Sequence, residues 1–164
     1  MILRNWHLLL FFISIFSVSF ALIAENFFGL QPCELCLKQR HPYYLFILVI
    51  LLSFVFQHFN KFLISIFLQI TVVYGLFYSI WHVGVENKLL DGPAGCSAGL
   101  SISKDTLSLK EQILNKQVIS CDEVIWSFFG ISAASINTLL LLFIFVINAL
   151  YIYRYYGKKE KKLL

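Results

Sequence analysis

Four long apolar stretches divide the chain, and shorter polar segments separate them. The stretches cover residues 6–24, 42–59, 62–81 and 130–153. A helix of about 20 residues, rising about 1.5 Å per residue, crosses a hydrocarbon core about 30 Å thick. Each stretch approaches or exceeds that length, so the pattern predicts four transmembrane helices.

The second stretch has a shortened apolar part, because Gln57 and His58 interrupt its end. Asn60 and Lys61 then leave room only for a tight turn before the third stretch. A connection this short predicts that the second and third helices are antiparallel neighbours. We expect Pro42 in the first turn of the second helix, where its missing N–H is no loss.

The first stretch could instead be a cleaved signal peptide, because Arg4 precedes the apolar run. However, Leu22, Ile23 and Ala24 form a poor cleavage site, and the run is long for the apolar part of a signal peptide. The pattern therefore favours a first helix that is retained.

Composition supports a membrane protein. The chain is 59% hydrophobic, 17% aromatic and 13% charged, whereas soluble domains are about 25% charged. A lipid-exposed surface accounts for so much Phe and Leu better than a cofactor site does. No basic stripe with interleaved aromatic residues occurs in the sequence, so nucleic-acid binding is not expected.

Lysine and arginine are unevenly placed, and their distribution predicts the orientation in the membrane. With four spans, both termini and the turn at Asn60 lie on one side. That side carries seven basic residues against one acid, whereas the other side carries six against eight. We therefore expect the termini in the cytoplasm and residues 25–41 and 82–129 outside. The basic residues on the cytoplasmic side are Arg4, Lys61, Arg154, Lys158, Lys159, Lys161 and Lys162.

All four cysteines fall in the two segments expected outside the cytoplasm, where disulfides form and persist. Cys33 and Cys36 lie in the first segment, and Cys96 and Cys121 lie in the second. Four cysteines allow three pairings, and sequence alone does not choose among them. Proximity in the chain favours Cys33 with Cys36 and Cys96 with Cys121.

The C-x-x-C run from Cys33 to Cys36 is the first candidate redox centre. Its disulfide would close a small ring and exchange readily, and one thiol of such a pair often has a lowered pKa. Arg40 follows Cys36 by four residues, so in a helix its guanidinium would lie on the same face and favour a thiolate. Arg40 could also hold an anionic quinone oxygen. The alternative, which we prefer for Lys38, is a cation that only marks the end of a span.

The second cysteine pair lies in a polar segment. Gly and Pro surround Cys96 and indicate an exposed, mobile loop, while residues 104–119 have a weak helical pattern. The pair could be a structural staple for this loop. A zinc site shared with the C-x-x-C is not expected, because Cys96 and Cys121 lie far apart and no histidine is close to either. Two pairs outside the membrane suggest a thiol–disulfide relay between a soluble protein and a lipid-soluble oxidant.

These motifs together resemble the DsbB family, the quinone-dependent oxidants of the periplasmic dithiol oxidase DsbA. The resemblance covers the whole chain: four spans, a C-x-x-C followed by Arg40, a second cysteine pair, and the run from Cys121 to Gly130 before the last helix. It implies an all-α membrane protein, with residues 1–164 forming one four-helix transmembrane bundle and two periplasmic loops. It also implies the bacterial inner membrane.

The resemblance implies the role of each candidate residue. Cys36 would face the quinone, which would be ubiquinone or menaquinone, and Arg40 matches the quinone-site arginine of the family. His82 ends the third span near the expected quinone position, although such a histidine is otherwise usually interfacial. A DsbA-like thioredoxin-fold oxidase would be the protein partner. The catalytic residues implied are Cys33, Cys36, Cys96 and Cys121, with the last two oxidising the partner.

The chain departs from the family at Lys38 and Gln39, where some relatives carry an acid, and its second loop is compact. Two rival enzymes remain: a DsbI-like oxidant with a dedicated partner, and a reductase of the vitamin K epoxide reductase-like type. The latter usually carries its C-x-x-C later in the chain and a thioredoxin-like domain. A rival of another class is a non-enzymatic membrane scaffold with a stapled loop, in which Cys33 and Cys36 could be replaced without effect.

Overall fold

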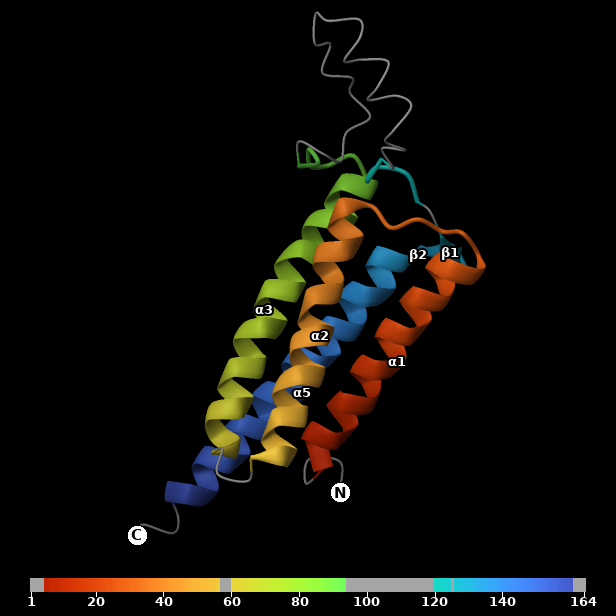
Figure 1. Cartoon of the computed structure of the whole chain (residues 1–164). Coiled ribbons are helices and arrows are strands. Elements are labelled where there is room, and N and C mark those ends of the chain that lie inside the picture. Colours follow the sequence, from red (N-terminus) through yellow and green to blue (C-terminus); the bar gives the residue numbers. More distant parts are fainter. Residues whose placement is uncertain (1–4, 57–59, 94–119, 125, 161–164) are drawn as a thin grey trace, which may run out of the picture.

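The computed structural model describes residues 5–56, 60–93, 120–124 and 126–160. Four long helices run side by side (Figure 1). Each is long and apolar enough to cross a membrane, which confirms the predicted all-α, four-helix membrane bundle. The helices are α1 (Trp6–Phe27), α2 (Glu34–Val55), α3 (Lys61–Glu86) and α5 (Ala133–Glu160), and a hairpin of β1 (Ser127–Phe128) and β2 (Ile131–Ser132) precedes α5.

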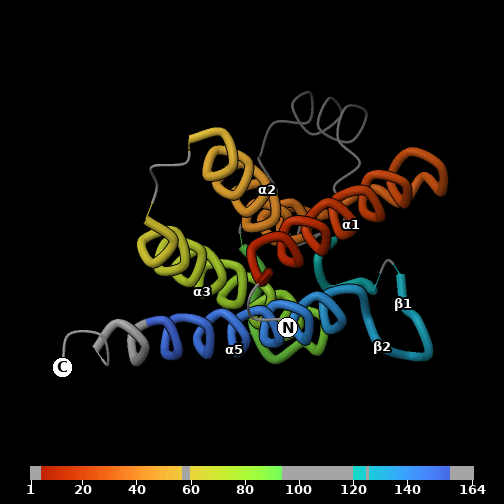
Figure 2. The backbone as a smooth tube through the Cα atoms, turned by 90° about the horizontal axis from the view of Figure 1, so that it is seen from below, coloured from red at the N-terminus to blue at the C-terminus, as the bar shows by residue number. Residues whose placement is uncertain are grey.

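The helix α3 packs against both α2 and α5, and α1 packs mainly against α2. Both termini lie at one end of the bundle (Figure 1), and Figure 2 gives the view from that end. Buried apolar side chains fill the centre, among them Trp6, Phe46, Leu68 and Leu141. Many other large apolar side chains are exposed on the outer faces, as expected where helices contact lipid.

A buried polar network joins three helices near the termini. The indole N–H of Trp6 donates to Oδ1 of Asn148 at 3.0 Å. The amide of Asn148 donates to the carbonyl of Ser65 at 2.9 Å and to Oε1 of Gln69 at 2.7 Å. Because unpaired polar groups are costly in an apolar bundle, this network favours one register of α1, α3 and α5.

The helix α2 begins at Glu34, whereas the predicted span begins at Pro42. The sulfur of Cys33 accepts a hydrogen bond from the backbone N–H of Cys36 at 3.3 Å and so caps the helix. Pro42 therefore lies inside α2, and the prediction that it occupies the first turn was wrong. The polar residues 38–41 concealed this early start, because hydropathy locates the apolar part of a helix rather than its first residue.

The hairpin before α5 was not predicted. Phe128 pairs with Ile131, and the two residues between them, Phe129 and Gly130, have φ of 51° and 79°. Positive φ at both central positions is typical of the tight turn that best fits strand twist. The apolar run here resembled the start of a helix, which in fact begins at Ala133. The predicted helical pattern over residues 104–119 lies outside the described residues.

Gly75 allows α2 and α3 to approach each other closely. A Cβ atom at this position would lie 2.7 Å from Cγ of Pro42 and 3.2 Å from Cδ1 of Leu141. Small residues commonly permit such approaches between membrane helices. The ring of Pro42 is part of the α2 backbone, so it cannot move away alone.

We expect Gly75→Ala to lower the free energy of unfolding by about 1–3 kcal/mol, because the added methyl group overpacks the contact with Pro42. Thermal unfolding of the protein in detergent measures the effect. Gly84→Ala is the matched control, because its Cβ would meet only the flexible side chain of Leu90, at 2.7 Å. Equal Tm values for the two variants would contradict the importance of the close approach at Gly75.

Candidate functional site

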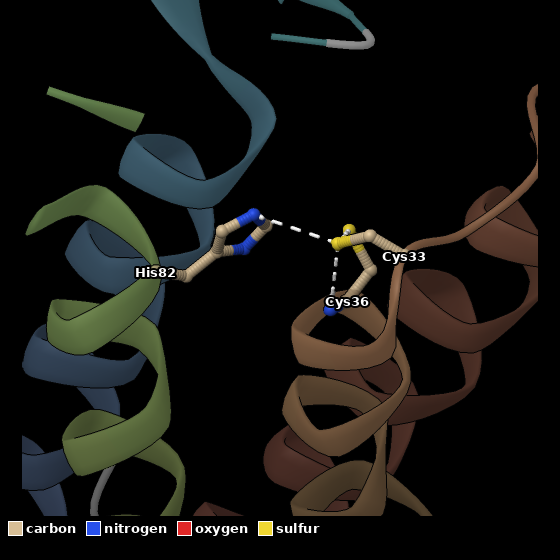
Figure 3. A group of neighbouring side chains, drawn as sticks. All are labelled: Cys33, Cys36 and His82. Atoms are coloured by element: carbon tan, nitrogen blue, oxygen red, sulfur yellow. Dashed lines mark hydrogen bonds between the residues drawn. The ribbon is translucent and has the colours of Figure 1, made fainter. Parts of the chain in front are cut away.

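Three side chains with reactive or titratable atoms meet at the start of α2 and the end of α3. The sulfurs of Cys33 and Cys36 are 2.8 Å apart, and Nε2 of His82 lies 3.6 Å from the Cys33 sulfur (Figure 3). Cys33 and His82 are buried, at 2% and 3% exposure, whereas Cys36 is half-buried. His82 therefore contacts a predicted redox sulfur directly.

The sulfur of Cys33 lies in surroundings that favour its thiolate. As a thiolate it accepts hydrogen bonds from the thiol of Cys36, from the ring of His82 and from the backbone N–H of Cys36. The bond from the Cys36 thiol is the largest cause that holds the pKa of Cys33 well below its usual value, and burial opposes it. Cys33 also sits at the N-terminus of α2, where the helix dipole favours an anion. The geometry therefore favours the thiolate of the reduced pair on Cys33.

Cys33 and Cys36 carry free thiols. Their sulfurs and a ring nitrogen of His82 all lie within 4.8 Å of one another, the group in the described part of the chain that could hold a metal ion. A structural zinc site needs four ligands, and this group supplies three. That the protein binds no metal therefore stays a prediction. The two adjacent thiols of Cys33 and Cys36 suit thiol–disulfide chemistry.

Arg40 lies one helical turn after Cys36, on the face that the spacing predicts. Its Nη1 atom donates to Oε2 of Glu25, near the end of α1, at 2.7 Å. The Arg40 side chain is 15% exposed and that of Glu25 is 34% exposed. This ion pair was not predicted from the sequence, because the two residues belong to different helices. A guanidinium has five N–H donors, so Arg40 can pair with Glu25 and still donate hydrogen bonds to another group.

Cys121 is fully buried in an apolar cluster that also contains Cys33, Leu35 and Val85. It takes part in a disulfide. Cys96, its predicted partner, lies outside the described residues. The structure thus brings Cys121 to the same end of the bundle as the C-x-x-C, although the two motifs are far apart in the sequence.

A groove of about 480 Å³ opens between α2 and α3 on the outer face of the bundle. Neither Cys36 nor Arg40 lines it, so this groove is separate from the sulfur site. The lining residues are His41, Tyr44, Leu45, Phe67, Ile70, Thr71 and Tyr74.

A chain of polar side chains leads from His82 into the bundle. Gln39 Nε2 lies 2.9 Å from His82 Nδ1, Asn137 donates to Gln39 Oε1 at 3.1 Å, and Tyr43 donates to Asn137 Oδ1 at 2.6 Å. Gln39, Tyr43 and Asn137 were not predicted as site residues. The available signal was weak: isolated polar side chains in or beside an apolar span, which tend to face the bundle interior.

Comparison with known proteins agrees with the observed architecture. Residues 3–151 match the family model described as Disulfide bond formation protein DsbB. Disulfide bond formation protein B of Psychrobacter sp. is 29% identical, over 95% of this chain and 95% of the relative. The Acinetobacter baylyi protein of that name is 30% identical over 74% of each chain. An uncharacterized protein of Rickettsia prowazekii is 30% identical, over 94% of this chain and 90% of the relative. No solved structure matches the chain significantly.

The family match includes α1, α2, α3 and the first part of α5, together with the whole cysteine and histidine site. Two relatives named for disulfide bond formation align with most of the chain. The four apolar helices make the protein a multi-pass membrane protein. This chain therefore belongs to the disulfide bond formation protein DsbB family.

Proposed function

We propose that the protein reoxidises the dithiol of a DsbA-like, thioredoxin-fold oxidase and passes two electrons to a membrane quinone. The observation that carries this proposal is the meeting of Cys33, Cys36 and His82, with buried Cys121 in the same cluster as Cys33. This geometry supplies a thiol pair with one stabilised thiolate beside a second redox cysteine. Membership of the family supports the same chemistry.

Electrons enter at the second cysteine pair. The partner's thiolate attacks the sulfur of Cys96, the bond from Cys96 to Cys121 breaks, and Cys121 leaves as a thiolate. The partner is now joined to Cys96 by a mixed disulfide. Attack by the partner's second thiol releases the oxidised partner and frees Cys96. This release can precede or follow transfer to the C-x-x-C.

Transfer then takes place between Cys121 and Cys33. The Cys121 thiolate attacks Cys33 in the C-x-x-C disulfide, and Cys36 leaves as a thiolate. The free thiolate of Cys96 next attacks Cys121, which restores that pair and releases Cys33. The shared buried cluster of Cys33 and Cys121 supports this step, because the two residues need no large movement of the helices to meet.

Reoxidation of Cys33 and Cys36 restores their disulfide and releases two electrons and two protons. When bound, a quinone would supply the acceptor for these electrons. The residues at the site suit such a head group. Cys36 is the more exposed of the two cysteines, and Arg40 on the same face has N–H donors that can hold a carbonyl or anionic oxygen.

We also propose that both termini are cytoplasmic and that the cysteine site faces the periplasm, in a bacterial inner membrane. Figure 1 places the two termini at the same end of the bundle, and the start of α2 lies at the opposite end. Lys61 and Arg154, at the ends of α3 and α5, belong to the terminal side. The excess of basic residues on that side supports this orientation.

Substitution of Arg40 tests its role in quinone use. We expect Arg40→Lys to weaken quinone reduction partly, because lysine keeps the charge but loses the two-point geometry. Arg40→Gln should cost about ten- to a hundredfold in rate or apparent affinity, since a charge-assisted hydrogen bond is lost. The measurement is quinone reduction at several quinone concentrations with saturating reduced partner.

Lys38→Gln is the matched control for Arg40. Lys38 is a cation on the same helix, and its ammonium pairs with Glu34 at 3.1 Å on the surface. We expect this variant to keep wild-type quinone dependence. If Arg40→Gln also keeps the wild-type dependence on quinone concentration, Arg40 is only an interfacial anchor.

The order of thiol attack is tested by trapping. Cys121→Ser leaves Cys96 without its internal resolving thiol, so a mixed disulfide between Cys96 and the oxidised partner should accumulate. A non-reducing gel should show a band of combined mass that reduction removes. The proposed order is wrong if Cys33→Ser traps this species equally well while Cys121→Ser traps none.

A further inference from the structure

We propose that Gln39 and Asn137 are positioning residues, which hold His82 as a neutral imidazole with its proton on Nε2, aimed at the Cys33 sulfur. This inference depends on a series of hydrogen bonds in which each residue accepts from the one before it and donates to the next. It runs from Tyr43 through Asn137, Gln39 and His82 to Cys33. The inference rests on the proposed function only in taking Cys33 as a reacting sulfur.

The series of hydrogen bonds begins at the hydroxyl of Tyr43. Tyr43 is 3% exposed, and within the described residues its hydroxyl bonds to Oδ1 of Asn137 at 2.6 Å. If the Asn137 amide were reversed, its nitrogen would donate to Tyr43, and the Tyr43 proton would have no acceptor within the described residues. A buried donor without an acceptor is costly. Tyr43 therefore holds the oxygen of Asn137 toward itself.

Ser79 fixes the same amide independently. The hydroxyl of Thr138 donates to the carbonyl of Ala134 at 2.8 Å. The Ser79 hydroxyl can donate to the same carbonyl, at 3.4 Å, or to the Thr138 oxygen, 2.7 Å away. With its own proton used in this way, the Ser79 oxygen accepts from the Asn137 amide nitrogen at 3.2 Å. Tyr43 and Ser79 thus favour the same orientation of the Asn137 amide.

The orientation passes from Asn137 to Gln39 and then to His82. The Asn137 nitrogen also donates to Oε1 of Gln39 at 3.1 Å, which turns the Gln39 nitrogen toward His82. That nitrogen lies 2.9 Å from Nδ1 of His82. Because an amide nitrogen can only donate, Nδ1 must present its lone pair, and the proton of the neutral ring is on Nε2.

Among the described residues, the Nε2–H group then has one good acceptor. The sulfur of Cys33 is 3.6 Å away, within the range for a hydrogen bond to sulfur (Figure 3). Oε1 of Glu86 is 3.9 Å from Nε2, too far for a hydrogen bond, and the other oxygen of Glu86 accepts from Ser132 at 2.5 Å. His82 thus adds a donor to Cys33, which directs negative charge to that sulfur of the pair.

The test uses the full-length reduced protein in detergent, with isotope-labelled histidine and cysteine. NMR shifts of the ring nitrogens report the tautomer of His82, and the Cβ shift of Cys33 across pH reports its thiol pKa. His82→Gln and Cys33→Ser identify the signals. We expect the Nε2–H form in the wild type. Asn137→Leu should populate the Nδ1–H form and raise the Cys33 pKa by about one pH unit, since a donor to the thiolate is weakened.

Gln39→Glu should move the same pKa in the opposite direction. A carboxylate beside Nδ1 can only accept, so both ring nitrogens of His82 should be protonated, and the added positive charge should lower the Cys33 pKa. Loss of packing cannot produce shifts of opposite sign in the two variants. Gln69→Glu is the matched control, because Gln69 belongs to the polar network at the other end, and it should leave both signals unchanged.

The other charged groups near this site stay the same in every variant. They are Glu86 and the ion pairs of Arg40 with Glu25 and of Lys38 with Glu34. A wild-type His82 protonated on Nδ1, or equal Cys33 pKa values in the wild type, Asn137→Leu and Gln39→Glu, would overturn the inference. These measurements need neither quinone nor partner, so failure of the proposed electron transfer would be seen separately.

Discussion

Polar side chains inside a membrane bundle have no water to bind, so they must satisfy one another. In the described residues, every buried side-chain nitrogen and oxygen has a hydrogen-bond partner. One network centres on Asn148 near the termini, and the other runs from Tyr43 to His82 at the opposite end. The same rule fixes which way each amide points. It therefore joins the packing of the helices to the proton on His82, and through His82 to the charge on Cys33.

The Cys33 sulfur serves the fold and, in the proposed function, also the reaction. It caps α2, and it receives donors from Cys36 and His82 that stabilise a thiolate. Stabilising the reduced form makes a disulfide a stronger oxidant, which suits the proposed role of a pair that accepts electrons from an oxidising partner. The potential of DsbA is about −120 mV, and each 29.6 mV or so changes a two-electron equilibrium about tenfold. A pair near or below that potential works only if a strong acceptor such as a quinone removes the electrons.

Much of the fold follows from local sequence properties, because apolar length and residue spacing are visible without a structure. Four helices and the placement of Arg40 one turn after Cys36 could be predicted on that basis. The start of α2 could not, because it depends on a sulfur acting as a helix cap. Contacts between helices could not be predicted either, since one sequence does not show which helix faces pack against each other. The ion pair of Arg40 with Glu25 and the bond from Asn137 to Gln39 are examples.

In the proposed function, Cys33 and Cys36 deliver two electrons to a quinone. The direct measurement is anaerobic mixing of reduced protein, stripped of bound quinone, with one equivalent of quinone, followed by counting quinol and free thiols. Because forming each disulfide from two thiols releases two electrons, two thiols should be lost for each quinol formed. Cys121→Ser should keep this ratio, and Cys36→Ser should form no quinol. Quinol formation by Cys36→Ser at the wild-type rate, or no quinol from the wild-type protein, would contradict electron delivery by this cysteine pair.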